Sequence, residues 1–133
     1  MKFSVLIPTR DRLELLKAAV NSVLRQDYDD FEIVISDNCS SEPAEPWISS
    51  LREPRIRLLI QESPVPVTEN WNRALAASTG DYVLMLGDDD ALCPGYFRSV
   101  LQLLEAHGEP DCIYHVAYLF TYPGVIPGRR EGQ

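Results

Sequence analysis

The chain has few of the residues that mark a disulfide-rich, zinc-binding or membrane-spanning protein. Its three cysteines, Cys39, Cys93 and Cys112, are odd in number and widely spaced, so they fit neither a disulfide framework nor a zinc motif. No apolar run reaches the roughly 18 residues of a membrane span, and the run at the amino terminus is too short for a signal peptide. We therefore expect reduced thiols in a cytoplasmic protein without a transmembrane segment.

Positive charge is also scarce. The 12 Lys and Arg residues are outnumbered by 20 Asp and Glu residues, which gives a net charge of −8. A phosphate backbone would meet a predominantly negative surface, so the composition argues against a nucleic-acid-binding protein. An anionic ligand would need local help from a metal ion or from helix N-termini. With 133 residues, 45% of them hydrophobic, the chain has the size and composition of one soluble globular domain.

Short apolar runs alternate along the chain with segments of helical periodicity. This alternation predicts an α/β fold, with a mostly parallel sheet flanked by helices. We expect one domain over residues 1–122, followed by an irregular or disordered tail over 123–133, where no periodicity remains. Thr9 or Asp11 is expected to cap the first helix, and Thr68 the third. The expected strands are 3–7, 31–35, 55–60, 82–86 and 112–120, and the expected helices are 13–24, 47–51, 69–78 and 95–106.

The most informative feature is a run of three aspartates, Asp88-Asp89-Asp90, which follows the apolar run 82–86. Carboxylates this close repel one another, so they stay ionised most easily beside a bound cation or in open solvent. Open α/β sheets bind ligands at the carboxyl ends of their strands, and this position favours the cation. Asp is also common in turns, so a solvated acidic turn is the alternative.

Other polar residues follow the first and second expected strands. If these two strands lie beside the fourth, Pro8-Thr9-Arg10 and Asp37 line one rim with the aspartates. Asp37 could accept an N–H from a ligand such as a pyrimidine ring, or it could cap the following turn together with Asn38, which is the more common use. Arg10 and Arg12, near the start of the first helix, could pair with a diphosphate that also interacts with the helix dipole.

Two further polar candidates, Asn72 and Arg73, stand on the third expected helix. Their neighbours Trp71, Leu75 and Ala76 are expected to be packing residues of that helix.

Four segments in order along the chain together resemble the family 2 glycosyltransferases of the GT-A fold. The resemblance covers roughly Lys2 to Leu104, and four segments at matching spacing are far more specific than a lone acidic cluster. The segments are Ile7–Arg12, Val34–Asn38, Asn72–Tyr82 and Leu86–Gly95.

The resemblance implies a site for a nucleoside diphosphate sugar, with a UDP-sugar favoured. In this family the Asp after the second strand hydrogen-bonds the base, and here it falls on Asp37, with Thr9 lining the base pocket. The Asp-x-Asp motif falls on Asp88 and Asp90. Asp90 is the first choice for the ligand of Mg²⁺ or Mn²⁺, and Asp88 or Asp89 contacts the ribose or gives a second metal contact. The nucleotide-sugar-binding residues it implies are Pro8, Thr9, Arg10, Arg12, Asp37, Asn72, Arg73, Asp88 and Asp89.

The sequence departs from the family pattern at two positions. Family members often carry Arg directly before the residue matching Asn72, where this chain has Trp71, so Arg73 or Arg12 is expected to make the phosphate contact. The position before the aspartates is often Asp and here is Gly87, which leaves Asp88 as the first acid.

The general base of the family is an Asp or Glu in a second, acceptor-binding half, and we expect the chain to stop before it. We therefore expect the donor-binding domain of an inverting glycosyltransferase, with an unknown sugar, lipid or protein acceptor. The alternative is a binding or assembly module that retains the fold without catalysis. An exposed sheet edge left by the absent half would permit a homo-oligomer. A phosphoryl hydrolase or a receiver domain would need an acid after the first strand, where Ile7-Pro8-Thr9 stands.

Overall fold

The protein forms a four-stranded, fully parallel sheet in a computed structural model that describes residues 1–114. The strand order is β3-β2-β1-β4, so the ends of the first, second and fourth strands do lie side by side. The predicted α/β class and parallel sheet are confirmed. The strands are β1 (Phe3–Thr9), β2 (Phe31–Asp37), β3 (Ile56–Ile60) and β4 (Tyr82–Met85), and the helices are α1 (Leu13–Leu24), α2 (Glu45–Leu51), α3 (Val67–Ala77) and α4 (Tyr96–His107).

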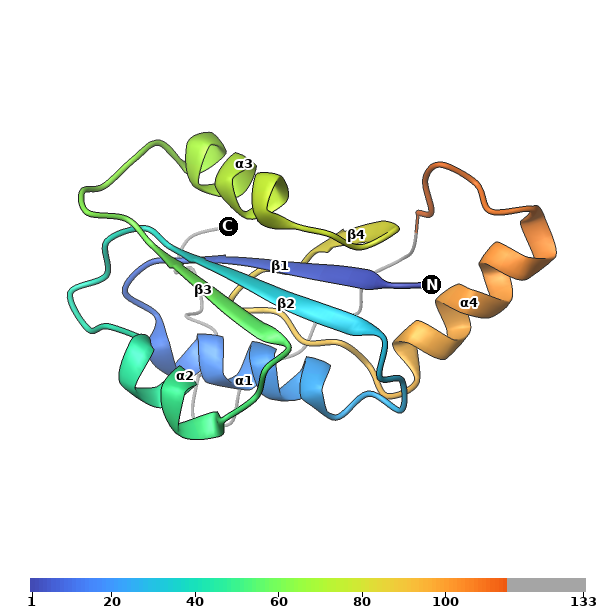
Figure 1. Ribbon diagram of the computed structural model, residues 1–133, viewed down its shortest axis with the longest axis horizontal. Coiled ribbons are helices and arrows are strands. Elements are labelled where there is room, and N and C mark those ends of the chain that lie inside the picture. The colour runs from blue at the N-terminus through green and yellow to red at the C-terminus, as the bar shows by residue number, and fades with distance from the viewer. Residues whose placement is uncertain (115–133) are drawn as a thin grey trace, which may run out of the picture.

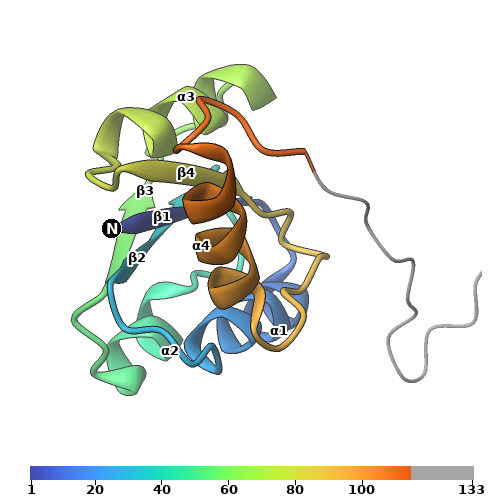
Figure 2. The ribbon, with the colours of Figure 1, turned by 90° about the vertical axis from the view of Figure 1, so that its right-hand side faces the viewer.

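Helices cover both faces of the sheet. Figure 1 shows α3 on one face and α1 with α2 on the other, and Figure 2 shows α4 near the β1 and β4 side of the molecule. The main core lies on the α1 face, where Phe97 of α4 stacks on Phe3 of β1 with ring centroids 4.9 Å apart and on Phe31 of β2 at 5.4 Å. This aromatic packing fixes α4 against the sheet, and with it the loop that joins β4 to α4.

Two predicted helix caps are wrong. The N-cap of α1 is Arg12, without a side-chain cap, because Thr9 belongs to β1 and the carboxylate of Asp11 accepts hydrogen bonds from Ser41 instead. The helix α3 begins at Val67, so Thr68 lies inside its first turn rather than before it.

The predicted last strand, 112–120, lies mostly outside the described residues, and so does the predicted tail, 123–133. The structure describes only Cys112 to Tyr114 of this predicted strand, and these residues have no strand conformation.

The expectation that Trp71, Leu75 and Ala76 are packing residues is also wrong. All three are exposed, Trp71 by 45% and Leu75 by 49%, whereas α3 buries Asn70 and Ala74 against the sheet. The amide of Asn70 explains this orientation, because it donates to the backbone oxygen of Ser36 at 2.9 Å and accepts from the Ser36 hydroxyl at 2.8 Å.

A buried carboxylate ties the amino ends of the strands together. Glu32 of β2 accepts hydrogen bonds from the Ser4 hydroxyl at 2.7 Å and from the Thr79 backbone N–H at 2.6 Å, and it pairs with Lys2 at 3.3 Å. Burial acts to raise the pKa of Glu32, but these hydrogen bonds outweigh it and lower the pKa from 4.5 to about 2. A Cβ at Gly80 would lie 2.8 Å from both the Lys2 oxygen and the Ser4 nitrogen, so only glycine allows this close approach.

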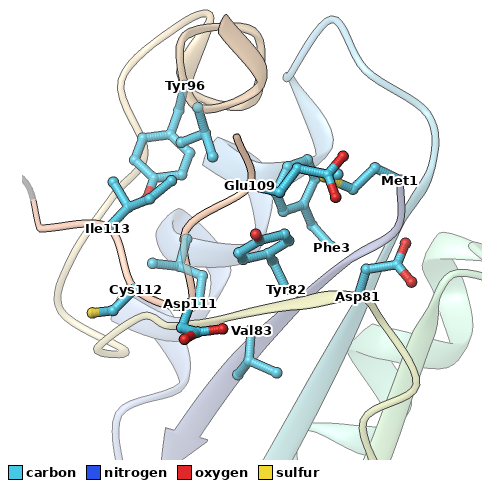
Figure 3. A pocket seen from close by; sticks show the side chains of 12 residues that line it. Met1, Phe3, Asp81, Tyr82, Val83, Tyr96, Glu109, Asp111, Cys112 and Ile113 are labelled. Atoms are coloured by element: carbon cyan, nitrogen blue, oxygen red, sulfur yellow. The ribbon is translucent and has the colours of Figure 1, made fainter. Parts of the chain in front are cut away.

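The strand β4 stands at an edge of the sheet, and a pocket of about 930 Å³ opens beside it. Figure 3 shows the side chains of Phe3 and Tyr82 reaching into this pocket, while Val83 points to the opposite side of β4. The pocket lies at the amino ends of β1 and β4, away from the aspartates that follow β4. The possible homo-oligomer stays a prediction, for which this open edge is the candidate contact.

No helix in the part of the chain that the structure describes is long and apolar enough to cross a membrane.

Candidate functional site

The carboxyl ends of three strands meet at one polar rim. Parallel pairing places Thr9 at the end of β1 directly beside Asp37 at the end of β2. The backbone N–H of Leu86 donates to the Leu6 oxygen at 2.9 Å, which continues the β4 pairing up to the residues just before the aspartates. This rim is the edge at which open α/β sheets bind ligands.

Asp88 is the buried member of the acidic run. Its side chain is 8% exposed, and its Oδ2 accepts a hydrogen bond from the Thr9 hydroxyl at 2.8 Å. Its Oδ1 lies 3.2 Å from Nη1 of Arg12, and the same nitrogen lies 3.2 Å from Oδ2 of Asp89. A buried carboxylate is stable only when it is paired and hydrogen-bonded, and Thr9 with Arg12 provides both.

Asp89 and Asp90 are exposed and lie on a tight turn closed by a hydrogen bond from the Asp90 N–H to the Gly87 oxygen at 3.0 Å. A Cβ at Gly87 would lie 2.7 Å from Oδ2 of Asp90 and 2.9 Å from Oδ1 of Asp89. Both atoms are the far ends of exposed side chains, so a side chain at position 87 would shift the two carboxylates away from this arrangement.

Asp37 is buried and caps the turn after β2. Its Oδ1 accepts from the Ser40 backbone N–H at 3.0 Å and from the Ser40 hydroxyl at 2.5 Å. The structure thus shows the turn-capping role that the sequence offered as one alternative. Asp37 is only 2% exposed, and none of the hydrogen bonds from described residues ends on its Oδ2. The neighbouring Asn38 exchanges two hydrogen bonds with the backbone of Val65, each 2.8 Å long.

Pro8 and Arg10 flank Thr9 at the same rim. Pro8 is half-buried within β1, and the exposed Arg10 pairs with Asp11 at 3.6 Å. Asp11 has a positive φ of 54°. Hydrogen bonds from Ser41 lower the pKa of Asp11 below its ordinary value. This strained corner holds the loop after β1 against the loop after β2.

Asn72 and Arg73 lie apart from this cluster. Asn72 is on the exposed side of α3, away from the buried face at Asn70. Arg73 lines a pocket of about 270 Å³ together with Gln61 and other residues that follow β3. In the strand order, β2 and β1 separate this pocket from β4 and the aspartates.

Sequence reasoning missed a buried amide pair beside Asp37. The backbone N–H of Gln61 donates to the backbone oxygen of Asp37 at 3.0 Å, and the side-chain nitrogen of Gln61 lies 3.5 Å from the side-chain oxygen of Asn70. The Oε1 atom of Gln61 is buried and has no hydrogen-bond partner among the described residues. A polar residue four positions before Ala74, on the buried face of a helix, was the available signal for Asn70.

The carboxylates suit a hard divalent cation that takes some of its ligands from the protein and the others from a substrate. Asp88 and Asp89 converge on one point, the Arg12 nitrogen, and carboxylate oxygens suit Mg²⁺ and Mn²⁺. Residues 1–114 contain no group of three or more His, Cys, Asp or Glu side chains arranged to hold a metal ion. Magnesium-type sites commonly use one or two carboxylates plus substrate phosphates, so two or three aspartates are a sufficient protein contribution.

The fold and the rim define an α/β protein with an acidic, polar edge at the carboxyl ends of its strands, where open α/β sheets bind ligands. A family model described as glycosyl transferase family 2 matches residues 4–128. The chain belongs to this glycosyltransferase family.

Two bacterial relatives illustrate the similarity. The chain is 34% identical over 104 residues to the GalNAc(5)-diNAcBac-PP-undecaprenol beta-1,3-glucosyltransferase of Campylobacter jejuni, a match covering 76% of this chain and 34% of that protein. It is 33% identical over 132 residues to the putative colanic acid biosynthesis glycosyl transferase WcaA of Escherichia coli, covering 98% of this chain and 45% of that protein. The chain thus spans less than half the length of these relatives.

Solved structures agree on the fold. The crystal structure of S. aureus TarS 1-349 matches with a TM-score of 0.75 and 25% identity, over 81% of this chain and 33% of that one. The same protein in complex with UDP-GlcNAc matches with a TM-score of 0.74 and 26% identity, over 81% of this chain and 32% of that one. The resemblance to the family 2 glycosyltransferases of the GT-A fold is therefore confirmed.

Proposed function

We propose that this chain binds a nucleoside diphosphate sugar, with a UDP-sugar favoured, together with Mg²⁺ or Mn²⁺ at the rim formed by Thr9, Asp37 and the aspartates. The observation that carries the proposal is the cluster in which Thr9 and Arg12 both contact Asp88 at the carboxyl end of β4. The similarity to TarS, which was solved with UDP-GlcNAc and with UDP, supports the donor class.

Each residue of the rim has a role in this proposal. Asp37 accepts the N–H of the base through its Oδ2, and Thr9 and Pro8 form the floor beside it. Arg12, Arg10 and the first-turn N–H groups of α1 attract the diphosphate. Arg73, in its pocket after β3, offers a further positive charge on the base side. Asn72 is assigned to the site by its place in the family motif alone.

The acidic run supplies the ligands of the cation. Asp90 is the first choice, because it is exposed at the rim, whereas Asp88 already holds Thr9 and Arg12 and is the second choice. When bound, such a cation stabilises the charge that develops on the departing nucleoside diphosphate. Asp89 lies between Asp88 and Asp90 in the sequence, and it contacts the ribose or gives a second metal contact.

The parent activity in this proposal is inverting transfer of the sugar to an unknown acceptor. That step needs a carboxylate to deprotonate the acceptor hydroxyl, and no described residue is assigned to this role. The comparisons do not favour the alternative of a non-catalytic module, since the named relatives are transferases.

Isothermal titration calorimetry tests the proposal. UDP is titrated into the chain in the presence of about 1 mM Mn²⁺, and we expect a Kd of roughly 1 μM to 1 mM. EDTA in place of Mn²⁺ is expected to abolish the binding. CMP and inorganic phosphate serve as control ligands. Absence of heat from UDP, with or without Mn²⁺, in a folded sample would contradict the proposal.

A further inference from the structure

Arg12 acts as a counter-ion for two carboxylates at once. Its Nη1 lies 3.2 Å from Asp88 and 3.2 Å from Asp89, so one guanidinium bridges the first two members of the acidic run. Of the two carboxylates, Asp88 is the buried one, with a side chain 8% exposed, and it has the greater need of a compensating charge.

The attachment of Arg12 is easily exchanged. Its side chain is 52% exposed, so water and salt screen its end of the ion pairs and a ligand phosphate can reach the guanidinium. Arg12 is also the N-cap residue of α1, and no side chain caps that helix start, so its backbone precedes first-turn N–H groups that attract an anion.

We propose that Arg12 is an exchangeable counter-ion that couples cation binding to nucleotide binding. In the ligand-free chain Arg12 offsets part of the negative charge of Asp88 and Asp89 and thereby competes with a divalent cation for them. When the nucleoside diphosphate arrives, Arg12 releases the carboxylates to the cation and pairs with a phosphate group. This inference rests on the proposed function and adds to it a binding order: the free cation binds weakly, and it binds well only with the nucleotide.

The coupling has a direction that can be measured. Under this proposal, Arg12 weakens cation binding when no nucleotide is present and strengthens nucleotide binding when the cation is present. Because coupling free energies are reciprocal, such a residue increases the effect of each ligand on the affinity for the other. Removing Arg12 should therefore reduce the coupling from both sides. A residue that served only to hold the loop in place would weaken both binding events together.

The test is calorimetry on Arg12→Gln, with Mn²⁺ titrated into the nucleotide-free chain and UDP titrated into the Mn²⁺-saturated chain. We expect the affinity for Mn²⁺ alone to rise about threefold to tenfold and the affinity for UDP to fall about tenfold. Arg25→Gln is the matched control, because it removes the same charge from an exposed position at the other end of α1 and is expected to change neither value. Circular dichroism checks that both variants fold.

Arg12→Lys separates the charge of the residue from its shape. It keeps the positive charge, so we expect its affinity for Mn²⁺ alone to stay within about twofold of that of the unmodified chain. The inference is overturned if Arg12→Gln binds free Mn²⁺ no more tightly than Arg25→Gln, or if Arg12→Lys binds it as tightly as Arg12→Gln. If the unmodified chain itself fails to bind UDP with Mn²⁺, the proposed function falls and this inference with it.

Discussion

Replacing Asp90 by Asn should lower the Mn²⁺-dependent affinity for UDP by roughly 100-fold or more, because a lost carboxylate ligand removes several kcal/mol of metal interaction. The structure indicates that this substitution removes a carboxylate without disturbing the fold. Asp90 is exposed, and its side chain makes no hydrogen bond or ion pair to another element within residues 1–114, whereas Asp88 also anchors Thr9 and Arg12. Calorimetry with UDP in Mn²⁺ and in EDTA gives the measurement, and the thermal unfolding temperature should not change.

Asp29→Asn is the matched control for this variant. Asp29 is a fully exposed aspartate, whose side chain lies 3.6 Å from Arg55, and it stands before β2 at the amino end of the sheet. We expect Asp29→Asn to bind UDP as the unmodified chain does. Unchanged UDP affinity of Asp90→Asn in Mn²⁺ would remove Asp90 from the metal site and leave Asp88 and Asp89 as the remaining candidates.

Acid should destabilise the fold through Glu32. The pKa of Glu32 is 4.5 in its ordinary environment and about 2 in the folded protein. A lowered folded-state pKa contributes stability that is fully present above pH 4.5 and is lost as the pH falls towards 2. The difference between the ordinary pKa of 4.5 and the folded-state pKa of about 2 corresponds to about 3 kcal/mol of unfolding free energy, since each pKa unit is about 1.4 kcal/mol.

Urea unfolding of the unmodified chain and of Glu32→Gln measures this contribution. Glu32→Gln retains the shape of the side chain and removes the titration, so other acidic groups cancel in the comparison. At pH 6 the unmodified chain should be more stable, and most of that advantage should disappear by about pH 2.5. A constant difference between the two proteins across this range would show that Glu32 is not stabilised in its ionised form.

Four of the expected strands, and the adjacency of the first, second and fourth, were predictable because they depend on local pattern and a simple topology. The apolar runs ending at Ile7 and Ile35, each followed by polar residues, place Thr9 and Asp37 at the end of neighbouring parallel strands, and the structure confirms this. The acidic run follows β4 for the same reason. Its position at the rim is a consequence of the α/β class rather than of any tertiary detail.

Details that depend on long-range hydrogen bonds were not predictable. The wrong cap at α1 reflects the pairing of Asp11 with Ser41, 30 residues away. The orientation of α3, which leaves Trp71 exposed, follows from the bonds between Asn70 and Ser36, 34 residues apart. The bridging contact of Arg12 likewise joins residues 76 positions apart, and nothing in its local sequence specifies it.

The most direct test of the account is nuclear magnetic resonance of the ¹⁵N-labelled chain titrated with UDP and Mg²⁺. We predict chemical-shift changes in the backbone amides of 9–12, 37–40 and 87–90, which form the rim, and no comparable changes in 81–84 or 111–113, which line the pocket at the amino ends of the strands. Changes concentrated at the pocket beside Tyr82, or none at the rim under saturating ligand, would contradict a donor site at the carboxyl ends of the sheet.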